Sequence, residues 1–71
     1  MKHLFKVPLQ NSDMFVSSIT DKHITYTVRD VKGNLLEPES TSEYVEVDGK
    51  VEFGNRFIQS EYFDYIKQVL Q

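Results

Sequence analysis

Alternating apolar and polar residues in the first half of the chain predict antiparallel β-strands. Between residues 3 and 9, apolar side chains recur at every second position, which is typical of a strand with one face on a core. Pro8 cannot donate a backbone hydrogen bond, so we expect this strand to lie at a sheet edge or to end there. The polar residues 11–13 then predict a turn.

Residues 14–30 predict a β-hairpin whose two loop residues are Asp21 and Lys22, although a four-residue loop with the same facing fits as well. The cross-strand pairs that follow are Ile19 with Ile24, Ser17 with Tyr26, and Phe15 with Val28. One face of this hairpin is apolar and comprises Phe15, Ile19, Ile24, Tyr26 and Val28. The opposite face is small and mostly polar and comprises Val16, Ser18, Thr25 and Thr27.

Two further segments complete the middle of the chain. Lys32-Gly33-Asn34 is a turn signal, and a short returning strand follows it at Leu35 and Leu36. Residues 37–42 contain a proline, glutamates and hydroxyl residues without an apolar anchor. We therefore expect a mobile loop there.

Asp48-Gly49 is the strongest turn signal in the sequence. A two-residue turn sets Val45 against Glu52, which mixes an apolar and a charged side chain. A three-residue loop with Gly49 in the left-handed conformation sets Val45 against Val51 instead. Because this second pairing separates the two faces, the pattern favours it.

The C-terminal residues predict a single helix, with Ser60 as N-cap and Glu61 in its first turn. Gly54 and Asn55 end the preceding strand and lead into it. Phe63 stands off the apolar stripe. That stripe comprises Tyr62, Tyr65, Ile66, Val69 and Leu70, with Ile58 one turn earlier.

These elements together predict an α+β fold in which a small antiparallel sheet of four or five strands, built from two hairpins, is covered by one C-terminal helix. The 71 residues, which include no cysteine, form one domain over residues 1–71. A chain of this length buries about 60% of its unfolded surface, so it has little room for a deep active site. The first nine residues contain no apolar run long enough for a signal peptide or a spanning helix, which predicts a cytoplasmic protein without membrane contact.

Charge is divided unevenly between the two halves of the chain. Residues 1–34 carry five basic and three acidic side chains, a net +2, whereas residues 35–71 carry three basic and eight acidic side chains, a net −5. Phosphate backbones draw their affinity from clustered Lys and Arg, so nucleic acid is an unlikely partner. The acids of the second hairpin and its loop offer an alternative, an inhibitor that imitates nucleic-acid charge. They are Glu37, Glu39, Glu43, Glu46, Asp48 and Glu52.

Chemistry-bearing residues do not form a motif. A grouping of His23, Asp21 and Ser18 arises easily by chance between neighbours, and His3, His23 and Asp13 lack the short-range spacing of metal ligands. The three glycines are isolated, so no loop cradles a phosphate. We therefore expect no catalytic residue, no metal and no cofactor, and a protein that is not an enzyme.

Nine aromatic residues dominate the apolar content, and most of them are expected in the core or at its rim. These are Phe5, Phe15, Tyr26, Phe53, Tyr62 and Tyr65. Tyr44 and Phe63 fall outside the predicted core faces, in acidic surroundings that disfavour a single-stranded nucleic acid. With Glu46 they form the predicted partner-binding set. The face of Val16, Ser18, Thr25 and Thr27 is the second choice.

The sequence thus predicts a small non-catalytic module that binds a protein partner in an accessory or regulatory role. Pairing of the Pro8 edge strand, or of the polar face of the first hairpin, with a second copy stays open, as does a homodimer.

Overall fold

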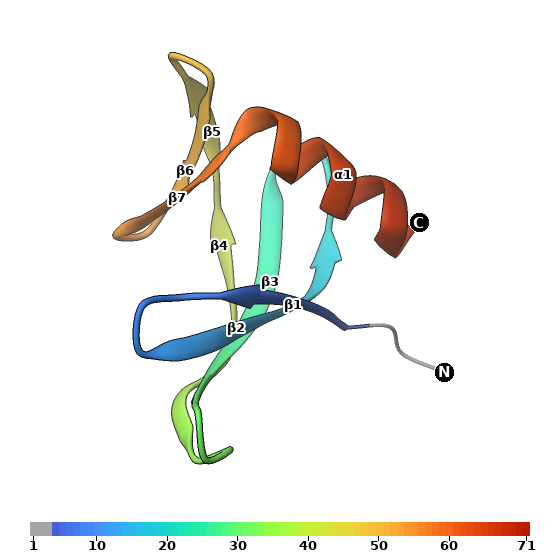
Figure 1. Ribbon diagram of the computed structural model, residues 1–71. Helices are drawn as coiled ribbons and strands as arrows, with labels where there is room; N and C mark the ends of the chain where they lie inside the picture. The colour runs from blue at the N-terminus through green and yellow to red at the C-terminus, as the bar shows by residue number, and fades with distance from the viewer. Residues whose placement is uncertain (1–3) are drawn as a thin grey trace.

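Two antiparallel sheets and one helix make up residues 4–71, which the computed structural model describes (Figure 1). The first sheet has the strand order β1-β2-β3-β4, formed by Phe5–Pro8, Ser12–Ile19, His23–Asp30 and Leu35–Glu43. The second has the order β5-β6-β7, formed by Val45–Val47, Lys50–Phe53 and Arg56–Gln59. The helix α1 spans Ser60–Leu70. The predicted α+β fold with an antiparallel sheet and a C-terminal helix is confirmed.

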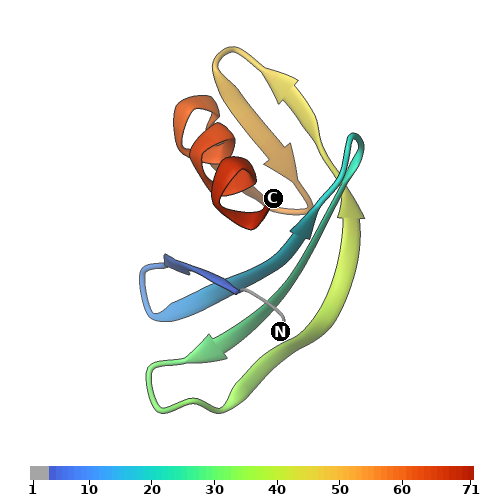
Figure 2. The ribbon, with the colours of Figure 1, turned by 90° about the vertical axis from the view of Figure 1, so that its right-hand side faces the viewer.

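The first sheet is strongly curved, and α1 and the second sheet lie on its concave side (Figure 2). The core fills the space between them and draws on both sheets and the helix. Its buried side chains are Val7, Met14, Val16, Ile24, Tyr26, Val28, Val51, Phe53, Ile58, Phe63 and Ile66.

β1 lies at the edge of the first sheet, as Pro8 predicts. Phe5 and Val7 face the core side of the sheet, and Leu9 packs against the core from the turn that follows. The turn to β2 is tighter than expected, because the Leu9 N–H donates to the Ser12 carbonyl at 2.8 Å and Ser12 already belongs to β2.

The register predicted for the first hairpin is right only near its turn. Ile19 pairs with Ile24 as expected, but a bulge between Val16 and Ser18 shifts the remaining pairs by one residue. The predicted pairings of Ser17 with Tyr26 and of Phe15 with Val28 are therefore wrong. One extra residue turns every side chain before it to the other face, so the buried side chains of β2 are Met14 and Val16 and not Phe15.

The mobile loop predicted over residues 37–42 is wrong, because these residues belong to β4. Two register shifts in the β3–β4 pairing accommodate Pro38 on an edge strand, where no inner ladder bond is needed. The hydroxyls of Thr25 and Thr41 lie 2.9 Å apart across the two strands. Hydroxyl and β-branched residues favour a solvated strand as readily as a loop.

The three-residue loop predicted at Asp48-Gly49 is also wrong. Val45 pairs with Glu52, and only two residues separate the strands. Asp48 and Gly49 have φ of 54° and 76°, the left-handed pair of a type I′ turn, whose twist matches that of a hairpin. This local preference outweighs the separation of faces, and Val45 is consequently exposed.

Gly54 and Asn55 form a turn into the additional strand β7 and do not lead directly into the helix. α1 has the predicted bounds, but Gln59 is its N-cap and Ser60 its first residue. The buried face of α1 centres on Phe63 and Ile66, so the expectation that Phe63 stands off the apolar stripe is wrong.

Candidate protein-binding surface

Exposed aromatic side chains gather along the face of α1 that the core does not use. Tyr62, Tyr65 and Val69 follow at helical spacing, and each is more than a third exposed. We call these three residues the α1 stripe. The Phe5 ring supports it from β1, with its centroid 5.9 Å from Tyr62 and 5.8 Å from Tyr65 in edge-to-face geometry. The prediction that both tyrosines are core or core-rim residues is wrong, because both are exposed and neither packs against the buried core.

A groove of about 240 Å³ adjoins this stripe where β1 approaches β7, and we call it the β1–β7 groove. Buried side chains such as Val7 and Ile58 form its floor. Pro8, Phe57 and Tyr62 form its rim, and the Phe57 side chain is 55% exposed. Large apolar side chains held open to water mark interaction sites more often than isolated surface residues do.

Two cations border the groove without making it strongly charged. The Lys50 ammonium lies 4.9 Å from the centre of the Phe57 ring, a cation–π contact. Arg56 binds both carboxylate oxygens of Glu37, with 3.2 Å between Nη1 and Oε1, and thereby ties β7 to β4. The hydrogen bond from Arg56 lowers the pKa of Glu37, and the same bond raises the pKa of Arg56. Glu37 is thus engaged within the fold.

Of the predicted partner-binding residues Tyr44, Glu46 and Phe63, the structure brings Tyr44 and Phe63 into contact and leaves only Glu46 exposed. Phe63 is only 3% exposed, so the expectation of an exposed anchor is wrong for this residue. Its ring packs against Tyr44 with 4.8 Å between centroids, and the Tyr44 hydroxyl donates to the Thr20 carbonyl at 2.6 Å. Tyr44 therefore supports the fold. Glu46 is exposed, and its carboxylate accepts a 2.6 Å hydrogen bond from Ser60.

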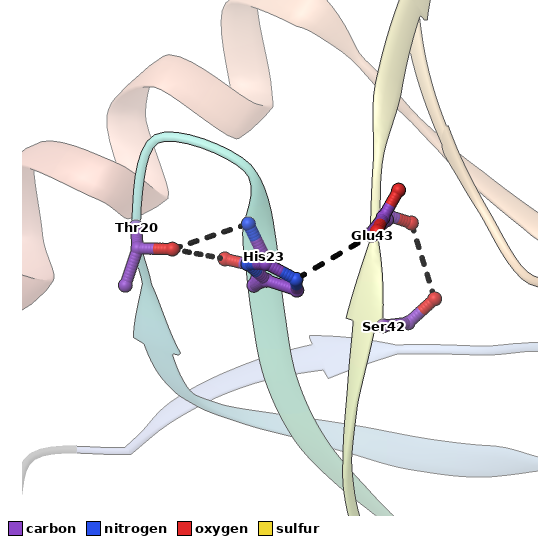
Figure 3. A network of polar contacts seen from close by, with 4 residues as sticks. All are labelled: Thr20, His23, Ser42 and Glu43. Atoms are coloured by element: carbon purple, nitrogen blue, oxygen red, sulfur yellow. Dashed lines mark hydrogen bonds and ion pairs between the residues drawn. The ribbon is translucent and has the colours of Figure 1, made fainter.

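His23 takes part in a polar network around the β2–β3 turn (Figure 3). Its N–H donates to the Thr20 hydroxyl at 3.1 Å, and its Nε2 lies 4.0 Å from a Glu43 carboxylate oxygen. These contacts close the turn and join β3 to β4. His23 thus contacts Thr20 and Glu43. These are not the residues of the His23, Asp21 and Ser18 grouping considered from the sequence. Within residues 4–71 no three His, Cys, Asp or Glu side chains gather to hold a metal, and His3 lies outside the described residues.

The convex face of the first sheet carries a second hollow of about 290 Å³. The face of Val16, Ser18, Thr25 and Thr27, which the sequence offered as a second binding surface, lies only in part on this convex side. Val16 is fully buried on the concave side. Two charged side chains, Arg29 and Glu39, line this hollow beside a single aromatic ring, that of Phe15. Leu4 and Thr27 complete the lining of the hollow.

Comparison of the chain with protein-family models, curated proteins and solved structures finds no match. No helix of residues 4–71 is long and apolar enough to cross a membrane. The sequence does contain a signal for the α1 stripe. The helix carries Tyr62, Phe63 and Tyr65, and because these three rings cannot all lie on one buried face, some of them must be exposed.

Proposed function

We propose that this protein is a small non-catalytic module that binds a protein partner through the α1 stripe and the β1–β7 groove. The observation that carries the proposal is that the exposed rings of Phe57 and Tyr62 line one apolar groove, while the exposed rings of Tyr62 and Tyr65 both pack on Phe5 beside it. Aromatic anchors that fill pockets contribute most of the binding energy in protein interfaces. The partner therefore presents apolar side chains.

This surface replaces the set predicted from the sequence. Phe63 leaves the set because it is buried, and Tyr44 holds the β4–β5 junction. Glu46 stays a candidate for a contact at the rim, where neutralising a single carboxylate costs little. An acidic inhibitor that imitates nucleic-acid charge would instead bind through carboxylates, and its affinity would fall steeply with salt.

Position-dependent cross-linking in native cell extract tests the proposal. A photoreactive phenylalanine analogue in place of Tyr65 is compared with the same analogue in place of Ser18, which is exposed opposite Thr25 on the convex face. We expect a protein to be captured from position 65 and not from position 18, equally well with and without nuclease. Equal capture from both positions, or capture that nuclease abolishes, contradicts the proposal.

The captured protein, once purified, allows an energetic test. Tyr65→Ala should weaken its binding by about 2 kcal/mol, which is roughly thirtyfold in Kd, and the loss should persist at high salt. Ser18→Ala is the matched control and should leave Kd unchanged. A Kd unaffected by Tyr65→Ala would move the interface away from the α1 stripe.

A further inference from the structure

Within the described residues each sheet has two edge strands, β1 and β4 in the first sheet and β5 and β7 in the second. Among them β1 and β5 are short edges that carry side chains of opposite charge, Lys6 and Glu46. Directly after β1 the Leu9 N–H donates to the Ser12 carbonyl across the turn, so Leu9 and Ser12 form a hydrogen-bonded pair that continues the register of β1 and β2. Such pairs alternate along the ladder. The backbone N–H and C=O of Lys6 therefore point away from β2, to the free edge. The Lys6 side chain is 60% exposed, and its ammonium lies 3.8 Å from an Asp13 carboxylate oxygen, so it already has one partner within the fold.

β5 presents a free edge of the same kind. Val47 and Lys50 close its two-residue turn and form a hydrogen-bonded pair, so the alternation turns the N–H and C=O of Glu46 away from β6. All three residues of β5 are exposed, and Val45 is 58% exposed. A flat, exposed apolar edge of this kind favours the addition of another strand.

We propose that β5 of one copy adds antiparallel to β1 of a second copy, with Glu46 opposite Lys6. The two residues exchange two backbone hydrogen bonds, and their opposite charges lie side by side on one face. On the other face Val45 of the first copy lies beside Val7, at the mouth of the β1–β7 groove. The occupant of the β1 edge is thus the Val45–Val47 segment of another molecule.

Charge favours this pairing over one that joins two identical edge strands. A symmetric β1–β1 pairing centred on Lys6 would oppose two ammonium groups, and a symmetric β5–β5 pairing would oppose two Glu46 carboxylates. Among the pairings of β1 and β5, only the mixed one sets opposite charges against each other. The ladder is short, because the Tyr44 N–H already donates to the Lys22 carbonyl at 3.1 Å and Pro8 has no N–H. The association is therefore weak and needs high protein concentration.

Sedimentation of the wild-type protein and two charge variants over a concentration series at low ionic strength tests the pairing. We expect the wild type to associate, and Lys6→Glu or Glu46→Lys alone to raise the apparent dissociation constant about tenfold. An equimolar mixture of the two variants should associate again, because Glu at position 6 of one then meets Lys at position 46 of the other. This rescue separates a broken contact from a damaged fold.

Ser18→Ala on the convex face of β2 is the matched control, since it leaves both edges and both charges intact. It should associate like the wild type. A wild type that stays monomeric throughout the series overturns the proposal, as does association that the single charge reversals leave unchanged or a mixture that fails to recover it. Because Val45 would lie at the mouth of the β1–β7 groove, the proposed partner should compete with self-association, and the series is therefore run on the purified protein alone.

Discussion

Replacing Phe63 tests which face of α1 is buried. The ring is 3% exposed and packs on Tyr44 at 4.8 Å between centroids, so Phe63→Ala removes a fully packed aromatic side chain. Such a change in a core costs about 3–5 kcal/mol. A chain of this length has a free energy of unfolding of about 4–10 kcal/mol, so the variant loses a third of its stability or more.

Tyr65→Ala is the matched comparison, because it removes an aromatic ring of similar size from the same helix. Tyr65 is 55% exposed, and what it loses is mainly the edge contact with Phe5 at 5.8 Å, worth about 1 kcal/mol. We expect the free energies of unfolding of the two variants to differ by about 2 kcal/mol or more. Urea titration followed by far-UV circular dichroism measures both values.

Should Phe63→Ala fail to fold, Phe63→Leu provides the measurement, with an expected loss of about 1–2 kcal/mol. Equal losses at the two positions, or a larger loss at Tyr65, would refute the reasoning. That result would mean that α1 is rotated to bury the stripe that contains Tyr62 and Tyr65.

Three further substitutions test one turn and two side-chain contacts of the fold. Gly49→Ala should destabilise the fold by about 1 kcal/mol, because a residue with a Cβ is strained at a φ of 76°. The added Cβ has no atom within 4 Å, so a steric clash would not explain the loss. An unchanged denaturation midpoint would contradict the left-handed turn. The lowered pKa of Glu37 means that its pair with Arg56 stabilises the fold above the ordinary carboxyl pKa of 4.5 and that this contribution disappears as pH falls through the lowered value. Glu37→Gln should therefore flatten the acid side of the stability-versus-pH curve, and an unchanged slope would count against the pair. Tyr44→Phe removes the hydrogen bond to the Thr20 carbonyl and should cost about 1 kcal/mol in the same urea titration, whereas full stability would show that water replaces this bond without loss.

Elements governed by local chemistry could be predicted from the sequence. The helix over Ser60–Leu70 follows from apolar spacing, and the turn at Gly33 follows from its Lys-Gly-Asn sequence, where φ is 90°. The edge position of β1 follows from the missing donor of Pro8. In each case the determining interaction lies within a few residues.

The register of the first hairpin could not be predicted in the same way. A bulge between Val16 and Ser18 has no marker in the sequence, because Ser17 and Ser18 are equally acceptable as the extra residue. The bulge is favoured by what it buries: Met14 and Val16 reach the helix and second sheet only after the shift. That advantage depends on residues far away in the chain.

The candidate surface was missed for a related reason. Tyr62 and Phe63 lie about 100° apart around the helix, so the sequence allows either one to face the core. Which of the two rings is buried depends on β7, because this strand brings Ile58 into the core beside the helix. β7 was not predicted from the sequence. Once Phe63 is buried, the α1 stripe has to face water.

Tyr44 connects these findings, because it is the one residue between β4 and β5 and so marks where the chain passes from the first sheet to the second. Its ring packs against Phe63, and its hydroxyl donates a hydrogen bond to the Thr20 carbonyl. These two contacts fix the direction in which the chain continues from β4 into β5. The free edges of β1 and β5 belong to different sheets. A strand added at one edge therefore leaves the other edge of the same molecule open, where a further β1–β5 contact of the kind we propose can form.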